Sequence, residues 1–466
     1  MWHFAAGGRV VACAAVVYVV GSAAPLRAQT LDQSLAAAYT NNPTLNSQRA
    51  ATRATDEYVP IALSGYRPQV FGNLSATTQW NETKAFSSIV QRTVTVQEQI
   101  NPFNAAITVS QTIYDGLRTA NSVRGAESQV RGQRELLRNT EQNVLLDAAT
   151  AYMNVLQNGA LVELQKQNLQ ALREELRAAR DRFAVGEVTR TDVAQAEASV
   201  ANAESQLAFA ESNLNTARAA FVRVIGLQPT KLSPGQPVEK LLPRTLDGAI
   251  GGSMAQHPAI KAAQFSVDAA LSNVKVAEGA LAPTLSLNGQ VSQSYNSSDT
   301  VDRQTDAQLS LNLSVPIYQG GGEFATIRQS KELLGQSRIE VDVNRDQIRS
   351  NVVQFWGALD AAKASIQSAQ ASVAANEIAL RGVREEWRVG QRTTLDVLNA
   401  QTALFNARAS LVIAQRDRVV ASYALLSSVG RLDSKTLGLK VATYNPKVHY
   451  DQVRDAWTGV RTPDGR

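Results

Sequence analysis

Twice in this chain, a Val-Gly pair is followed shortly afterwards by a threonine with an aspartate three positions later. The two copies are Thr189-x-x-Asp192 and Thr393-x-x-Asp396. In a capping box, the threonine hydroxyl accepts a hydrogen bond from a free backbone N–H at the start of a helix, and the carboxylate lies near the positive end of the helix dipole. We therefore predict that each motif begins a helix that returns from a tight turn.

Residues suited to catalysis or metal binding are few. Beyond the N-terminal segment the chain holds only two histidines, His257 and His449, which are too few and too far apart in the sequence for a metal cluster or a general base. The Gly320-Gly321-Gly322 run is followed by no lysine, so it is predicted as a strand-to-helix turn and not as a phosphate loop. We predict no catalytic residue, no metal site and no cofactor.

The N-terminus has the composition of a secretory signal. Arg9 precedes the apolar run Val10–Val20, which is followed by Gly21-Ser22-Ala23-Ala24-Pro25 and by a small residue at Ala28. We predict a signal peptide over residues 1–28, cleaved after Ala28. Cys13 is the only cysteine and lies in this segment, so the mature chain has no disulfide. Cleavage also removes Arg9 and Arg27, which lowers the net charge from +5 to +3, too mild a value to indicate a nucleic-acid partner.

The elements that must position the two threonine–aspartate motifs belong to an internal repeat. The segment TLDQSLAAAYTNNPTL at Thr30–Leu45 returns as TLDGAIGGSMAQHPAI at Thr245–Ile260, and later motifs recur in the same order. A repeat of this kind indicates one architecture used twice. His257 stands where the first copy has Asn42, so we expect it to lie at a helix end.

The spacing between the two copies changes along the chain. It is 215 residues from Leu31 to Leu246 but 204 from Tyr114 to Tyr318, which places an 11-residue length difference between Pro68 and Tyr114. Because loops tolerate insertions and packed elements do not, we predict a surface loop that differs between the copies.

The repeat divides the chain into five segments. After the signal peptide come the first repeat, a proline-rich connector in a mid-body belt, the second repeat and a C-terminal mid-body segment. Their predicted boundaries are residues 29–228, 229–244, 245–430 and 431–466.

Each repeat is predicted to hold one very long helix and a shorter return helix. Prolines are absent from Phe103 to Gln228 and from Ile317 to Asn445, and apolar residues recur at alternating intervals of three and four, as in a coiled coil. At about 1.5 Å per residue, each long helix spans on the order of 100 Å. The predicted long helices are Leu117–Ala184 and Glu323–Arg388, the return helices are Asp192–Ile225 and Asp396–Val429, and the helices at the repeat starts are Leu31–Leu63 and Leu246–Glu278.

Each repeat is also predicted to hold two strands. Apolar residues alternate with uncharged polar ones over Ile107–Ile113, Leu285–Tyr295 and Gln308–Ile317, which is typical of strands with one apolar and one polar face. Lengths of about 10–12 residues suit a tilted strand that crosses a bilayer, and the polar face would then line a wet lumen. A soluble sandwich with a solvated face is the alternative. The residues predicted to face the lumen are Ser286, Asn288, Gln308, Ser310 and Asn312.

Four strands are too few to close a barrel, and lipid does not tolerate open sheet edges. The chain must therefore oligomerise if the strands cross a membrane. A dimer, trimer or tetramer would supply about 8, 12 or 16 strands, and an aqueous lumen argues against eight.

The order helix, strand, strand, long helix, tip and return helix, given twice, resembles the TolC family of outer-membrane ducts over nearly all of the mature chain. The resemblance lies in LDQSLAAAYTNNP and LDGAIGGSMAQHP at the repeat starts, IYDG and IYQGG at the hairpin ends, and RFAVGEVTRTDV and EWRVGQRTTLDV at the tips. The C-terminal RTPDGR is similar to alphaproteobacterial members. The resemblance implies a mixed α+β membrane protein, a homotrimer whose 12-stranded β-barrel in the outer membrane continues as an α-helical barrel in the periplasm.

The function implied by the resemblance is a passive duct from the periplasm to the exterior. Its implied partners are outer-membrane lipid, a periplasmic adaptor and an inner-membrane pump of the resistance-nodulation-division or ABC type. The sequence does not decide between drug efflux and type I secretion. The alternative is a non-transporting periplasmic adaptor or stalk, which would need one helical hairpin and no membrane-length strands. The adaptor is expected to dock at the exposed turns Val185, Gly186, Val389 and Gly390.

The resemblance also implies a gate at the periplasmic end. Arg392 matches the family's arginine of the closing link, and Asp192 matches its acidic partner. Trp387 stands where the family has tyrosine. Asp396 matches one acid of a constriction ring, and Asn399 stands where some members carry a second acid.

Overall fold

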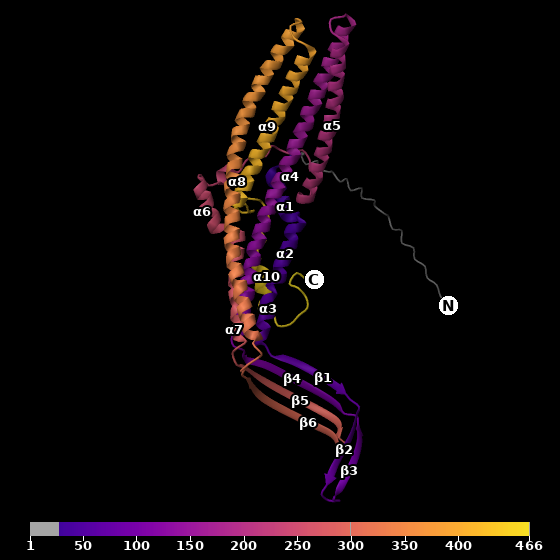
Figure 1. The fold of residues 1–466 in the computed structure, drawn as a ribbon, viewed down its shortest axis with the longest axis vertical. Helices are drawn as coiled ribbons and strands as arrows, with labels where there is room; N and C mark the ends of the chain where they lie inside the picture. The colour runs from indigo at the N-terminus through magenta and orange to yellow at the C-terminus, as the bar shows by residue number, and fades with distance from the viewer. Residues whose placement is uncertain (1–27, 299, 466) are drawn as a thin grey trace, which may run out of the picture.

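The computed structural model describes residues 28–298 and 300–465, so nearly all of the predicted signal peptide lies outside the described residues. The described chain is long and narrow (Figure 1). Helices fill one end and the middle, and a four-stranded sheet extends from the other end.

Two helical hairpins stand side by side and make most of the length (Figure 1). The long helices are α4 (Arg118–Ala184) and α8 (Gly322–Arg388), with 67 residues each. Their return helices are α5 (Arg190–Ile225) and α9 (Thr394–Ser428). The predicted bounds of these four helices agree with the structure to within about two residues, because each is limited by a glycine turn or a threonine cap.

The helices at the repeat starts are broken, which corrects the prediction of single helices over Leu31–Leu63 and Leu246–Glu278. Proline lacks an N–H and disfavours a helical residue before it, so the first helix of each repeat ends two residues before a proline. The residue before the proline then caps the next helix: Asn42 Oδ1 accepts from two backbone N–H groups, and His257 Nδ1 accepts from that of Ala259. The observed helices are α1 (Leu31–Asn41), α2 (Pro43–Asp56), α3 (Tyr58–Leu63), α6 (Leu246–Gln256) and α7 (Pro258–Gly279).

The main sheet is antiparallel, and each repeat contributes two of its strands. The strand order is β1-β4-β5-β6, so β1 and β6 are its edges. The strands are β1 (Gln69–Ala76), β4 (Phe103–Tyr114), β5 (Thr284–Ser298) and β6 (Val301–Ser314). The last predicted residues of β6, from Val315 to Ile317, lie beyond the strand.

The length difference between the repeats is a second hairpin and not the loop that the sequence predicts. It consists of β2 (Gln79–Ser87) and β3 (Arg92–Ile100). Gln69 pairs with Ser110 in the β1–β4 ladder and Gln79 pairs with Ile100 in the β2–β3 ladder, so the register runs on unchanged from one ladder to the next. The first repeat therefore carries one long two-stranded ribbon that reaches past the sheet (Figure 1).

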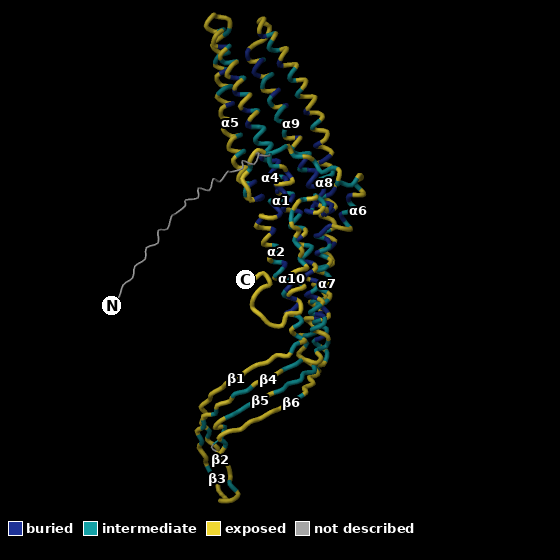
Figure 2. The backbone as a smooth tube through the Cα atoms, turned by 180° about the vertical axis from the view of Figure 1, so that it is seen from behind, coloured by how far each residue is buried: buried dark blue, intermediate teal, exposed yellow. Residues whose placement is uncertain are grey.

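The largest hydrophobic core lies in the middle of the molecule (Figure 2). Tyr152 of α4 and Phe221 of α5 are fully buried there, with their ring centres 6.3 Å apart. The connector packs on this core with a short 3-10 helix, η2 (Glu239–Leu241), and so does the C-terminal segment that leads to α10 (Lys447–Val453). Within the described part of the chain, no helix is both long and apolar enough to cross a membrane.

Candidate functional site

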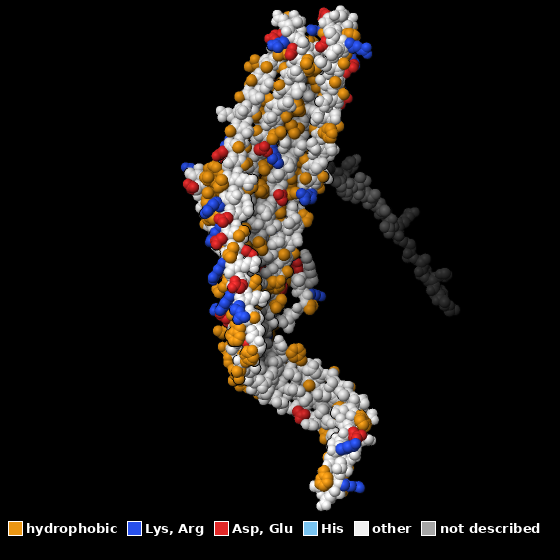
Figure 3. Space-filling model, in the orientation of Figure 1, with side chains coloured by type: hydrophobic (Ala, Val, Ile, Leu, Met, Phe, Trp, Pro, Cys, Tyr) orange, Lys and Arg blue, Asp and Glu red, His pale blue; other side chains and the backbone are white. Residues whose placement is uncertain are grey.

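The sheet places the five predicted lumen residues on one face. Ser286 lies opposite Asn312 and Asn288 lies opposite Ser310, and opposed residues of antiparallel strands point to the same side. Ser110 of β4 continues this face, because its hydroxyl donates to Asn288 Oδ1 at 2.8 Å. The sheet face turned to the viewer in Figure 3 is largely white, as expected for Ser, Thr, Asn and Gln side chains.

The other face of the sheet is apolar and exposed. Leu285 lies opposite Leu313 and Leu287 lies opposite Leu311, whose exposed fraction is 64%. Val70 and Leu74 of β1 extend the same kind of surface to the far edge. A continuous apolar face of this kind marks a surface that meets something other than water.

At the opposite end of the molecule, the two hairpin tips have the capped turns that the sequence predicts. Gly186 and Gly390 have φ values of +80° and +79°, which favour glycine, and the neighbouring valines Val185 and Val389 are exposed. Both capping boxes are formed. The Thr189 and Thr393 hydroxyls donate to the carboxylates of Asp192 and Asp396 at 2.7 and 2.9 Å.

Arg392 is engaged within its own hairpin. Its Nε donates to Glu386 Oε2 at 2.7 Å, and this hydrogen bond raises the pKa of Arg392. Among the described residues no contact joins Arg392 to Asp192, so their pairing remains a prediction for an assembled protein. Asp396 has its pKa lowered by hydrogen bonds from Thr393, and Asn399 is exposed one turn further along α9.

The two tips are joined by a contact that the sequence does not reveal. The Arg182 guanidinium of α4 lies 3.8 Å from the centre of the Trp387 ring of α8, and its Nη1 donates to the Trp387 carbonyl at 3.4 Å. Trp387 is only 8% exposed as a result. Arg182 belongs to the tip motif RFAVGEVTRTDV, but sequence spacing alone cannot pair positions on separate hairpins.

Two polar contacts below the tip join the same hairpins. Arg384 of α8 pairs with Glu175 of α4 at 3.0 Å, and the Glu175 side chain is only 12% exposed. Further down, Gln401 of α9 donates to Asn168 of α4 at 3.4 Å. With the Arg182–Trp387 contact these form a ladder, and separating the upper hairpins would break all three.

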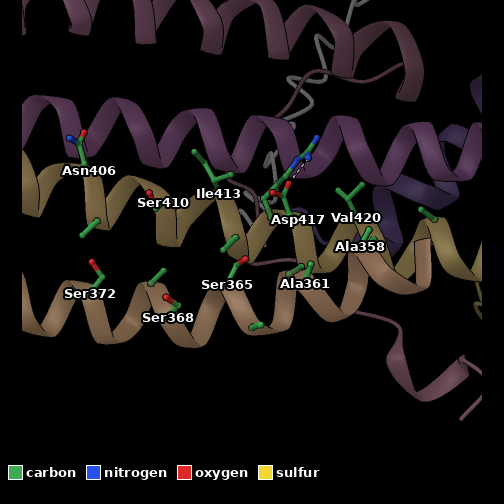
Figure 4. Close-up of a pocket in the computed structure, with 18 of the residues that line it drawn as sticks. Ala358, Ala361, Ser365, Ser368, Ser372, Asn406, Ser410, Ile413, Asp417 and Val420 are labelled. Carbon is green, nitrogen blue, oxygen red and sulfur yellow. Dashed lines mark hydrogen bonds and ion pairs between the residues drawn. The ribbon is translucent and has the colours of Figure 1, made fainter. Parts of the chain in front are cut away.

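A groove runs between α8 and α9 in their middle part (Figure 4). Its volume is about 1050 Å³. Small side chains line it, among them Ala358, Ser365, Ser368 and Ser372 of α8, with Asn406 and Ser410 of α9 opposite. The small residues leave space along the helices without a cluster of reactive groups.

The histidines take structural positions. Burial lowers the pKa of His257 to about 4, which keeps its ring neutral and able to accept the capping hydrogen bond. His449 Nδ1 lies 3.0 Å from Asp56 Oδ2 and ties α10 to α2. Within residues 28–298 and 300–465, no group of three or more His, Cys, Asp or Glu residues is placed to hold a metal ion.

Comparison with known proteins agrees with this architecture. A sequence model described as outer membrane efflux protein matches residues 35–227 and 250–431. Outer membrane efflux protein BepC of Brucella suis is 46% identical over 440 residues, which cover 94% of this chain and 93% of BepC. Outer membrane protein TolC of Vibrio cholerae is 27% identical, with 86% of this chain and 92% of that protein covered.

The fold is also that of a solved channel. The CmeC outer membrane channel of Campylobacter jejuni superposes with a TM-score of 0.77 over 91% of this chain and 89% of that one, at 16% identity.

Proposed function

The chain belongs to the family of outer membrane efflux proteins, and from this premise we propose that three copies close a single passive duct from the periplasm to the exterior. The protein is a channel of the outer membrane and shares the TolC-like fold. The observation that carries the proposal is the sheet: one face is lined mainly by uncharged polar side chains, with Asp306 further out along β6, and the other is apolar and exposed.

The two unpaired edges of the sheet support a closed ring of several copies. An open edge in lipid leaves backbone N–H and C=O groups without partners, which costs several kcal/mol for each group. Pairing β6 of one copy with β1 of the next removes both edges. Three four-stranded sheets give about twelve strands, enough for a water-filled interior, whereas about eight strands are filled by side chains.

The helical hairpins are proposed to continue the duct into the periplasm. The polar groups of the tips suit a passage that is opened mechanically by a partner. We assign energy supply to an inner-membrane pump of the resistance-nodulation-division or ABC type, reached through a periplasmic adaptor at the Val-Gly turns. Both drug efflux and type I secretion are consistent with such a duct.

The gate is proposed to lie at the hairpin tips. Asp192 and Arg392 would pair between hairpins in the assembled duct, and Asp396 with Asn399 would form a constriction ring of reduced charge. The contact of Arg182 with Trp387 is proposed to hold the two hairpins of one copy together in the resting state. All of these contacts are non-covalent, so a docking partner could break them without a chemical reaction.

A periplasmic adaptor or stalk is the alternative, and the sheet argues against it. A stalk has no use for membrane-length strands with an exposed apolar face, and one hairpin would suffice for it.

The proposal is tested by assembly and conductance together. Expressed in a Gram-negative host, the mature chain should be extracted from outer membranes as a heat-modifiable trimer and should form pores in planar bilayers. Crosslinking in cells should then capture an adaptor and an inner-membrane pump. A monomer that leaves the periplasm with osmotic shock would favour the stalk, and a trimer without conductance would reject the duct.

A further inference from the structure

The C-terminal segment that follows α10, residues 454–465, runs toward the sheet and then curls back, so that the C-terminus lies near the level of α10 (Figure 1). It lies beside α3, close to the end of the helices where β1 begins (Figures 1 and 2). Two contacts hold it there. Arg67 Nη1 donates to the Ala456 carbonyl at 2.7 Å, and the Arg67 guanidinium lies 4.7 Å from the centre of the Trp457 ring.

Trp457 is held in place and yet remains exposed. Its exposed fraction is 67%, although one face of its ring is stacked against Arg67. Val460, three residues later, is fully exposed. An indole ring combines a large apolar body with one polar N–H, so its preferred place is a boundary between water and an apolar phase.

The position of Arg67 fixes the level of Trp457 relative to the membrane. Arg67 precedes Gln69, the first residue of β1, by two residues, which is about 7 Å along an extended chain. The headgroup layer on each side of a bilayer is roughly 5–8 Å thick. If β1 enters the hydrocarbon at Gln69, the Arg67–Trp457 stack therefore lies at the level of the headgroups.

Other aromatic residues mark the same level. Tyr66 precedes β1, Tyr114 ends β4 and Tyr318 follows β6, and all three are exposed. Figure 3 shows hydrophobic side chains gathered where the helices meet the sheet. Rings of Trp and Tyr at this level are characteristic of proteins that cross a bilayer.

We propose that residues 454–465 are a membrane-surface anchor whose Trp457 ring lies in the phospholipid headgroups of the inner leaflet of the outer membrane. Arg67 orients the ring and presents a positive charge to the lipid phosphates. Only the first repeat offers this contact to the anchor, because the position equivalent to Arg67 in the second repeat is Ala282. The proposal rests on the outer-membrane location of the channel and does not depend on which substrate passes through the duct or on how the duct opens.

Quenching by lipid tests the position of the ring. In the full mature chain, Trp80, Trp356 and Trp387 are replaced by Phe so that Trp457 is the only tryptophan. The protein is reconstituted in vesicles of phosphatidylethanolamine and phosphatidylglycerol that contain lipid brominated either near the headgroup or near the chain end. We expect strong quenching by the shallow bromines, weak quenching by the deep ones and little quenching by aqueous iodide.

A second single-tryptophan protein that keeps only Trp387 is the control, because α8 places this residue on the order of 100 Å from the sheet. It should not be quenched by either brominated lipid. Quenching of Trp457 by iodide but not by lipid would overturn the proposal, since the ring would then lie in water. Protection from both quenchers would overturn it as well, because a neighbouring copy of the chain would then cover the ring.

The role of Arg67 is tested in the same protein. Arg67→Ala removes both contacts to the segment, so most of the quenching by shallow bromines should be lost. Arg92→Ala removes the same charge at the far end of the same ribbon and should leave the quenching unchanged. Equal quenching in all three proteins would show that Arg67 does not position the ring.

Discussion

At the scale of single residues, the proposed gate would depend on which side chains cross between the two hairpins. Arg392 and Asp192 each find a partner in their own hairpin, Glu386 and Thr189. The Arg182 guanidinium instead stacks on the buried Trp387 ring of the other hairpin. A tyrosine at this position would offer a hydroxyl, whereas tryptophan offers a larger ring face for a cation.

Arg182→Ser should therefore favour the open duct. A cation–π contact is worth about 0.5–2 kcal/mol, and three copies would shift a two-state gate by about tenfold or more. The expected result is a higher single-channel conductance or open fraction in planar bilayers, with thermal stability nearly unchanged.

Arg180→Ser is the matched control for this variant. Arg180 pairs with Glu197 at 2.6 Å within the first hairpin, so its loss removes the same charge near the tip without crossing between hairpins. If both variants opened the duct equally, tip charge and not the Arg182–Trp387 contact would control the gate.

The two helix caps that precede proline give a residue-scale prediction about pH. The pKa of His257 is lowered to about 4, while an unfolded histidine titrates near about 6.5. Below about pH 6.5 the unfolded chain binds a proton that the folded chain does not, so stability falls as the pH falls. The loss is about 1.4 kcal/mol per pH unit and reaches about 3 kcal/mol near pH 4.

His257→Asn should remove this pH dependence, because Asn42 performs the same capping in the first repeat without a titratable group. Thermal melting of the helical part at pH 7.5 and pH 5 is the measurement. The two proteins should differ little at the higher pH, and the variant should be the more stable at the lower. An equal drop in melting temperature for both would assign the acid sensitivity to another group.

At the scale of elements, the sheet register decides which side chains meet lipid. Leu311 lies opposite Leu287 on the apolar face, and Asn312 lies opposite Ser286 on the polar face. Leu311→Lys should impair assembly, because a cation near mid-membrane costs about 2–4 kcal/mol. Asn312→Lys should assemble normally and alter conductance.

The yield of heat-modifiable oligomer and the current through single pores measure the two effects. The neighbouring positions serve as controls for each other, since they share a strand and differ only in face. Equal assembly defects in both variants would contradict the register and, with it, the lipid contact of the sheet.

The elements also show how far sequence patterns reach. The four long helices are predictable because their ends are marked by glycine turns and threonine caps. The breaks at Pro43 and Pro258 are missed because proline at the first turn of a helix is compatible with the same apolar period on both sides. The β2–β3 hairpin is missed because its faces mix charged and aromatic residues, Glu82 and Lys84 between Trp80 and Phe86, so no clean alternation appears.

In the candidate site, too, features set within one element are predictable and contacts between elements are not. The polar face of β5 and β6 is predictable, since the alternation of residue types along one strand determines which side chains share a face. The pairing of Arg182 with Trp387 and of Arg384 with Glu175 depends on how two separate hairpins lie side by side. The apolar periodicity within one hairpin does not reveal which of its residues face the other hairpin.

At the scale of the whole molecule, transport in the proposed function depends on the adaptor that docks at the hairpin tips. Val389→Asp should abolish export in cells while oligomer yield stays normal, because it places a charge on the exposed apolar turn proposed for adaptor docking. Ile378→Asp is the matched control: it introduces the same charge on an exposed apolar position of α8, three turns below the tip.

Drug resistance or secretion in a strain that lacks its own channel is the readout for both variants. Normal export by the Val389 variant would place the adaptor elsewhere on the helices. Loss of export by the Ile378 variant as well would extend the docking surface down α8.

The two unpaired edge strands of the sheet determine whether a mutant allele is dominant or recessive. Because β1 and β6 differ, each copy in the proposed ring would pair with two neighbours, and a copy with one damaged edge strand could still join the ring through its other edge. In a cell that makes intact and spoiled copies in equal amounts, about one ring in eight would consist of intact chains alone if three copies assemble at random. An allele that damages β1 or β6 should therefore act as a dominant negative, whereas an allele that prevents the chain from folding should be recessive.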